Sequence, residues 1–145
     1  MKRKQEYEKD FYAWAIHNAQ LLREGKLAEI DIENIAEEIE SMGKSEKREL
    51  VNRLAVLITH LLKWQFQPER RSNSWKYTIE EQRDEVLELL EESPSLKKEL
   101  EAKFIHAYEK ALILASEETS IDESEFPKKP PFNLKNCLSN TFLPD

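Results

Sequence analysis

The segment Leu50–Phe66 constrains the fold more than any other part of the sequence. Its apolar residues are too numerous for one helical stripe and stand at positions 50, 51, 54–58, 61, 62, 64 and 66. This pattern is typical of a helix that is buried on most sides. We therefore predict a central helix that ends near Gln67, because Pro68 disfavours helical geometry in the residue before it.

The composition favours helices over strands. Glycine and proline supply only 2 and 6 of the 145 residues, while Glu, Lys, Leu and Ala dominate. The predicted class is all-α, and a chain of this length fits one domain. We predict a single-domain bundle of about five helices over residues 1–120. A C-terminal arm, residues 121–145, is expected to wrap on this bundle as part of the same domain.

Capping residues and glycines set the expected bounds of the first helices. An apolar stripe predicts a first helix over Tyr7–Leu22 that stops at Gly25. Asp31 is a suitable N-cap for a second helix. We expect that helix to end at Gly43 in the left-handed conformation, and Ser45 to open the central helix.

The second half of the chain is predicted to hold two further helices and the arm. Thr78 to Glu81 has the spacing of a capping box, so a fourth helix should start at Thr78. Ser93 and Pro94 should begin a fifth helix that continues to about Glu118. In the arm we expect one short helical turn near residues 133–139. The arm could cover a minor apolar strip on the fifth helix, made of Ile105, Leu112 and Ile113.

Charge and cysteine content exclude several classes of function. The 22 basic and 29 acidic residues give a net charge of -7, which disfavours nucleic-acid binding. With Cys137 as the single cysteine, neither an internal disulfide nor a multi-cysteine metal site can form. No apolar run approaches the length of a membrane span. We predict a cytoplasmic protein with no membrane partner and no cofactor.

Ordered landmarks recur along almost the whole chain. They are Asp10–Trp14, Leu21–Gly25, Asn34–Gly43, His60–Gln65, Ser74–Trp75, Glu81–Arg83 and Ser93–Leu96. Together they resemble the bacterial family known as domain of unknown function 29. The resemblance implies a helical fold and carries no activity, cofactor or functional residue with it.

Arg83 and Gln82 share the helical arc of Ile79 and Val86, which should face the core. A buried guanidinium requires polar partners. We expect Arg83 to be buried and bonded to a carboxylate of the second helix. The candidate carboxylates are Glu37, Glu38 and Glu40. The structural interpretation is a tie between helices, and the functional alternative is a cavity with a charged floor.

His60 is the histidine of the most apolar helix, and Arg53 precedes it by seven residues. The pair matches the loose R-x(4-6)-H pattern of helical ribonucleases from toxin systems, but about 0.4 such matches are expected by chance. A hydrogen-bonded structural histidine is the simpler interpretation. A metal site would require His17, His106 or glutamates to join His60, and no Glu-x-x-His pair exists. We predict no metal.

Basic and aromatic residues interleave in the segment Gln67–Tyr77. It carries Arg70, Arg71 and Lys76 around Trp75. The acidic fourth helix could neutralise this segment internally. Alternatively, the segment forms an exposed surface for an acidic partner protein or a phosphate-bearing ligand. Under that alternative, Arg70, Arg71 and Trp75 mark the binding surface, with Trp75 held against the bundle and at least one arginine in solvent.

The sequence contains no convergent set of acid, base and nucleophile. This favours a non-enzymatic interaction or scaffold module that binds a partner protein. The enzymatic alternative is a ribonuclease that uses Arg53 and His60. The sequence is compatible with a homo-oligomer.

Overall fold

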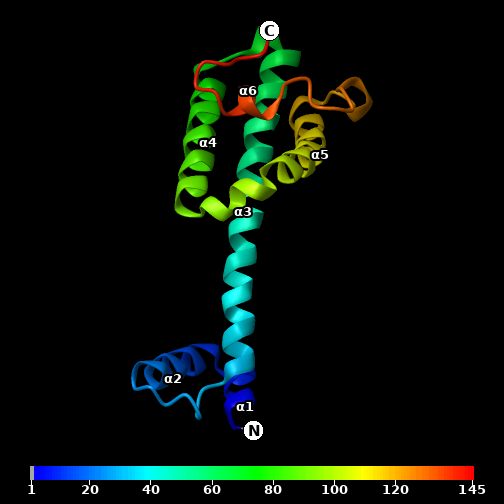
Figure 1. Ribbon diagram of the computed structural model, residues 1–145. Coiled ribbons are helices and arrows are strands. Elements are labelled where there is room, and N and C mark those ends of the chain that lie inside the picture. Colours follow the sequence, from blue (N-terminus) through cyan, green and yellow to red (C-terminus); the bar gives the residue numbers. More distant parts are fainter. Residues whose placement is uncertain (1) are drawn as a thin grey trace. The chain divides into compact units, whose positions relative to one another are not determined.

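The computed structural model describes residues 2–145, with side chains described from residue 6 onward (Figure 1). All regular secondary structure in this range is helical, which confirms the predicted all-α class. The α-helices are α1 (Lys2–Lys9), α2 (Phe11–Arg23), α3 (Ile32–Phe66), α4 (Asn73–Glu92), α5 (Leu100–Thr119) and α6 (Leu134–Leu138). Packing divides the chain into two compact units, which we call unit 1, up to Ser45, and unit 2, Glu46–Asp145.

The predicted break at Gly43 is wrong, because α3 runs without interruption from Ile32 to Phe66. Gly43 has no positive φ, unlike Gly25 at 71°. A glycine inside a helix costs only about 1 kcal/mol relative to alanine. The residues on both sides of Gly43 are mostly Glu, Lys, Arg and Leu, which are strong helix formers, so propagation outweighs that cost.

The predicted first helix is divided in two at Asp10. The Asp10 side chain accepts a hydrogen bond from the backbone N of Ala13 at 3.1 Å and caps α2. Aspartate is among the best N-cap residues, and this local bond outweighs continuity with α1. The end of α2 is as predicted, since the chain turns away at Gly25 in the left-handed region.

Helix α4 begins at Asn73, so the capping box predicted at Thr78 is wrong. Ser72 is the N-cap, and its side chain accepts a hydrogen bond from the backbone N of Trp75 at 3.2 Å. Serine is a somewhat better N-cap than threonine. The link between α3 and α4 is therefore short, with one 3₁₀ turn at Pro68–Arg70.

In unit 2, the C-terminal half of α3 is the central element, with α4, α5 and α6 around it (Figure 1). The core includes fully buried side chains from α3, such as Leu54, Leu57 and Ile58. The arm adds Phe126, Phe132 and Cys137 to the same core, and α6 forms the expected short helical turn. The arm does not cover the whole minor strip of α5, because Ile105 and Ile113 stay more than half exposed.

Candidate functional site

A buried polar network holds α2 against the start of α3 in unit 1. The indole Nε1 of Trp14 donates to Asp31 Oδ2 at 2.9 Å. Asn18 accepts the backbone N–H of Asp31 at 2.8 Å and donates to the carbonyl of Trp14 at 2.9 Å. Trp14 and Asn18 are each only 3% exposed. Hydrogen bonds that are shielded from water fix geometry well, so this part of unit 1 is preorganised.

Three aromatic rings extend this network toward α1. The Tyr7 ring lies 4.7 Å from that of Trp14 and 5.8 Å from that of Phe11, between centroids. Its hydroxyl donates to Glu38 Oε1 of α3 at 2.5 Å. The hydrogen bond to Glu38 raises the pKa of Tyr7, since ionising the phenol would remove the donor. These contacts connect all three helices of unit 1.

Helices α2 and α3 also form an apolar groove beside this network. The groove has a volume of about 320 Å³. It is lined by Phe11, Trp14, Ala15, Asn18, Ala19 and Leu22 of α2 and by Ile35, Glu38, Ile39 and Met42 of α3. A groove between two helices that is lined mostly by apolar side chains can accept the apolar face of a third helix. We call the groove lining, together with the exposed residues Tyr12 and Ile16 of α2, the α2–α3 face.

Unit 1 exposes most of the large hydrophobic side chains at the described surface. Eight of the twelve that are exposed belong to it, with exposed fractions of 44–77%. They are Phe11, Tyr12, Ile16, Leu22, Leu27, Ile32, Ile39 and Met42. Soluble proteins rarely gather so much apolar surface in one region unless it binds something.

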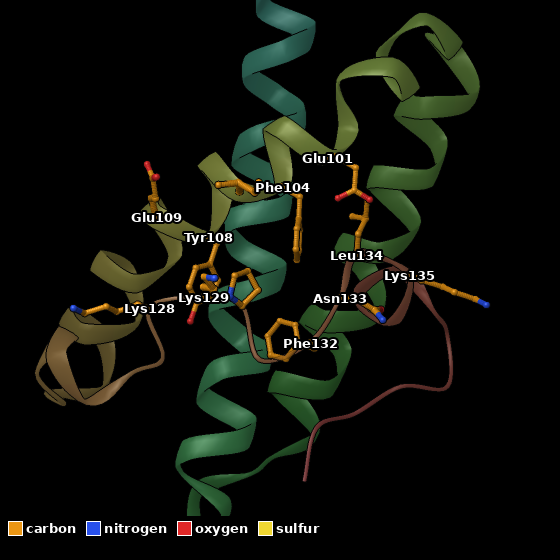
Figure 2. A pocket seen from close by; sticks show the side chains of 12 residues that line it. Glu101, Phe104, Tyr108, Glu109, Lys128, Lys129, Phe132, Asn133, Leu134 and Lys135 are labelled. Atoms are coloured by element: carbon orange, nitrogen blue, oxygen red, sulfur yellow. The ribbon is translucent and has the colours of Figure 1, made fainter.

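A second groove lies in unit 2 between α5 and the arm, with a volume of about 740 Å³ (Figure 2). Phe104 and Tyr108 of α5 and Phe132 of the arm lie around the same space, whereas Lys128 and Lys135 point away from it. The lining also includes Glu101, Glu109 and Lys129. Because its charged side chains are of both signs, this groove does not select a ligand by charge.

Two buried side chains bind the arm through hydrogen bonds to its backbone carbonyls. The Tyr108 hydroxyl donates to the Pro127 carbonyl at 2.5 Å, and burial raises the pKa of Tyr108 to about 12. Arg83, 2% exposed, donates from Nε to the Cys137 carbonyl at 2.7 Å and from Nη2 to the Phe142 carbonyl at 2.6 Å. The same burial lowers the pKa of Arg83.

The carboxylate partner predicted for Arg83 is therefore wrong. Carbonyl groups of the arm take that place, and they come from residues more than fifty positions away in the sequence. A backbone carbonyl has no sequence signature, so the side-chain pattern pointed to glutamates instead. Gln82 is 8% exposed, and its Oε1 has no hydrogen-bond partner among the described residues.

The two adjacent arginines have different environments. Arg71 donates from Nε to the Trp64 carbonyl at 2.7 Å, and its guanidinium lies 5.1 Å from the centroid of the Trp64 ring. Its Nη2 also reaches the carbonyl of Pro144 at 3.5 Å. Arg70 is exposed. Arg71 thus joins α3 to the end of the chain, and Arg70 is the arginine available to a ligand.

Trp75 of the predicted surface is half-buried under a lysine. The Lys63 Nζ lies 4.8 Å from the centroid of the Trp75 ring and 3.2 Å from Glu118 Oε1. Lys63 is 8% exposed. A cation placed between an aromatic face and a carboxylate is a stabilising arrangement. These contacts tie α3, α4 and α5 together.

Arg53 and His60 are each held by contacts of their own. Arg53 lies 3.6 Å from Glu49 Oε1 and 3.8 Å from Glu85 Oε2. The Nδ1 of His60 is 2.9 Å from the Val56 carbonyl, which can only accept, so Nδ1 carries the proton. Burial lowers the pKa of His60. Seven residues of helix separate the two side chains by about 10 Å along the axis.

The α2–α3 face was not among the predicted sites. The apolar stripe that predicts the first helix contains Phe11, Ala15 and Leu22 together with Trp14 and Leu21, so all five residues share one side of the helical wheel. Only Trp14, Asn18 and Leu21 of α2 are buried. The available signal was that Tyr12 and Ile16 extend the apolar arc beyond the width that one packing partner can cover.

The described residues thus form an all-helical protein with two apolar grooves, and they contain no group of three His, Cys, Asp or Glu side chains arranged to hold a metal ion. A family model, Domain of unknown function DUF29, matches residues 6–143, so the chain belongs to this family. Comparison with curated proteins and with solved structures found no match. Within residues 2–145, no helix combines the length and the apolar character that crossing a membrane requires.

Proposed function

We propose that the protein is a helical interaction module that binds a helix of a partner protein on the α2–α3 face. The observation that carries this proposal is the concentration of exposed apolar side chains in unit 1, eight of the twelve at the described surface. Four of the eight, Phe11, Leu22, Ile39 and Met42, line a groove of about 320 Å³. Recognition of an amphipathic helix in an apolar groove is a common mode of protein interaction.

Burial of a few apolar side chains can supply much of the free energy of binding. Burying one Ile, Leu or Met side chain gains about 1.5–3 kcal/mol. Ile39, Met42 and Leu22 are 59%, 63% and 44% exposed, so a helix that covers them removes much of this surface from water. The Trp14–Asn18–Asp31 network holds the groove in shape before binding, which lowers the entropic cost of association.

The ribonuclease alternative has less support. Arg53 is paired with carboxylates, and Nδ1 of His60 is bonded to a backbone carbonyl. Purified protein incubated with total RNA should leave it intact, and His60→Ala and Arg53→Ala should behave like the wild type. RNA cleavage that both substitutions abolish would establish the enzyme instead.

The interaction proposal is tested with a photo-crosslinking amino acid at Ile16, in full-length protein in the native cell. Ile113 of α5 is the matched control, because the two isoleucines are 54% and 51% exposed. We expect ultraviolet light to yield one reproducible protein adduct from position 16 and none from position 113. The mass of the adduct identifies the partner.

Two results would contradict the proposal. One is the absence of any reproducible adduct at position 16 and at a second position on the face, Met42. The other is an equal yield of the same adducts at positions 16 and 113, which would indicate nonspecific contact. An adduct of either kind, another protein or a second copy of this chain, supports binding at this face.

A further inference from the structure

The apolar stripe of α2 that borders the groove is nearly symmetric about its own midpoint. In chain order it reads Phe11, Ala15, Ala19 and Leu22, which is large, small, small and large. At 100° per residue these four side chains fall within an arc of about 80°. An antiparallel helix presents these sizes in the reverse order, and the reversed order is again large, small, small and large. The stripe is therefore complementary in size to a second copy of itself.

We propose that the partner on the α2–α3 face is a second copy of this chain, with the two α2 helices packed antiparallel about a two-fold axis. Phe11 of each copy then meets Leu22 of the other. Ala15 meets Ala19 near the axis, where small side chains permit close approach of the helices. This inference rests on the proposed function and specifies its partner.

The stripe of α3 completes the interface. Ile35, Ile39 and Met42 form the other wall of the groove. In the two-fold arrangement, the first part of α3 from each copy flanks the paired α2 helices, giving a four-helix bundle core. A symmetric interface uses the same patch on both molecules, so the groove of one copy faces the groove of the other in this arrangement.

The small core of unit 1 supports the proposal that another molecule covers this face. Trp14 and Leu21 are the buried hydrophobic side chains found among its described residues. Small domains bury a smaller fraction of their surface and are correspondingly less stable, so association can contribute to their stability. The cysteine content of unit 1 is zero, because Cys137 lies in unit 2. A second copy of the chain can supply these apolar contacts, and it is present wherever the first copy is.

The charge of the chain predicts an unusual salt dependence. Each copy carries a net charge of -7, so two copies repel each other at long range. Salt screens this repulsion and leaves apolar contacts intact. Self-association should therefore tighten as the salt concentration rises. Binding to a basic partner would weaken under the same change.

The first experiment measures the mass of the full-length protein by sedimentation equilibrium across a range of concentrations and at low and high salt. We expect a monomer–dimer equilibrium that shifts toward dimer at high salt. Ile39→Glu should abolish the dimer. Ile113→Glu, which places the same charge at a similarly exposed isoleucine of unit 2, should leave it unchanged. Circular dichroism checks that both variants keep their helix content.

Cysteine pairing tests the antiparallel register. Ala15→Cys and Ala19→Cys proteins are purified separately, mixed and oxidised. We expect the mixed disulfide to exceed both self-disulfides, because residue 15 of one copy faces residue 19 of the other. Cys137 is fully buried, and its thiol pKa is raised to about 12 by that burial, so it should not exchange.

The results separate this inference from the proposed function. A monomer at every concentration, or a dimer that Ile39→Glu leaves intact, overturns the second-copy proposal. Dominant self-disulfides overturn the antiparallel packing. If the protein is monomeric and the crosslinker at position 16 captures a different protein, the proposed function stands and only its partner changes. If the protein is monomeric and no adduct forms, both fail.

Discussion

Unit 2 and unit 1 are both helical, but they are stabilised in different ways. The core cluster of unit 2 contains 21 buried residues, drawn from α3, α4, α5, the arm and the 3₁₀ segment Pro94–Glu99. Among the described residues of unit 1, two hydrophobic side chains are buried, Trp14 and Leu21. Unit 1 instead depends on the hydrogen bonds that join Trp14, Asn18 and Asp31.

The difference shows how the chain divides stability from recognition. Apolar burial contributes about 25 cal/mol per Å² removed from water, so a large core carries most of the free energy of folding. Hydrogen bonds contribute less, typically about 1 kcal/mol each, but they fix orientation. Unit 2 has the first kind of support. Unit 1 has the second, which leaves its apolar side chains available for binding.

The largest effect is expected from a cavity in unit 2. Leu57 is 0% exposed, so Leu57→Ala should lower the free energy of unfolding by about 2–5 kcal/mol. Leu27 of unit 1 is 59% exposed and does not line the groove, so Leu27→Ala should change it by less than about 0.5 kcal/mol. Urea denaturation followed by circular dichroism measures both. Equal decreases in the free energy of unfolding for the two variants would contradict the proposed difference between the two units.

The next effect concerns the attachment of the arm. Arg83→Met should remove both donors from the carbonyls of Cys137 and Phe142 and lower the free energy of unfolding by about 2–4 kcal/mol. Arg70→Met is the matched control, since Arg70 is exposed, and it should be nearly neutral. Hydrogen exchange should show early loss of protection in α6. A loss below about 0.5 kcal/mol for Arg83→Met would mean that these bonds do not hold the arm.

A smaller loss of stability is expected when the polar network of unit 1 is disrupted. Asn18→Ala leaves the backbone N–H of Asp31 without its acceptor and the carbonyl of Trp14 without this donor, which should cost about 1–2 kcal/mol. The cost should be local. Hydrogen exchange should accelerate in α2 while the amides of α4 and α5 keep their protection. Uniform acceleration across the chain would show that the two units unfold together.

Sequence patterns predicted the parts of this fold that depend on strong local signals. The central buried helix, the end of α2 at Gly25 and the short α6 follow from apolar density, a positive φ at glycine and local caps. The break at Gly43 was wrong, because a single glycine costs less than the flanking residues gain. The start of α4 was misplaced, because the capping-box spacing at Thr78 was preferred to Ser72, which is the N-cap in the structure.

The contacts of the candidate sites were harder to predict. Arg83 was expected to be buried, and it is 2% exposed, but its carbonyl partners lie in the distant arm. At least one of the two arginines of the basic segment was expected in solvent. Arg70 is exposed, but the sequence did not indicate which of the two it would be. The α2–α3 face was missed because apolar residues on one side of a helix are normally expected to be buried. The sequence does not show that few residues of α2 are covered by other helices.

The smallest expected effect is a pH dependence located in unit 2. Burial is the main cause that lowers the pKa of His60 in the folded protein, and the nearby cation of Lys63 also lowers it. The folded state then binds fewer protons than the unfolded state, whose histidine has a pKa of about 6.5. The stability that His60 contributes is complete above about pH 6.5 and is lost as the pH falls below that value. Urea midpoints at pH 7.5 and 5.5 should show this loss in the wild type and a weaker one in His60→Gln. His106→Gln, which changes an exposed histidine, is the control and should show the same decrease in stability as the wild type. If His60→Gln also loses as much stability at pH 5.5 as the wild type, groups other than His60 cause the loss.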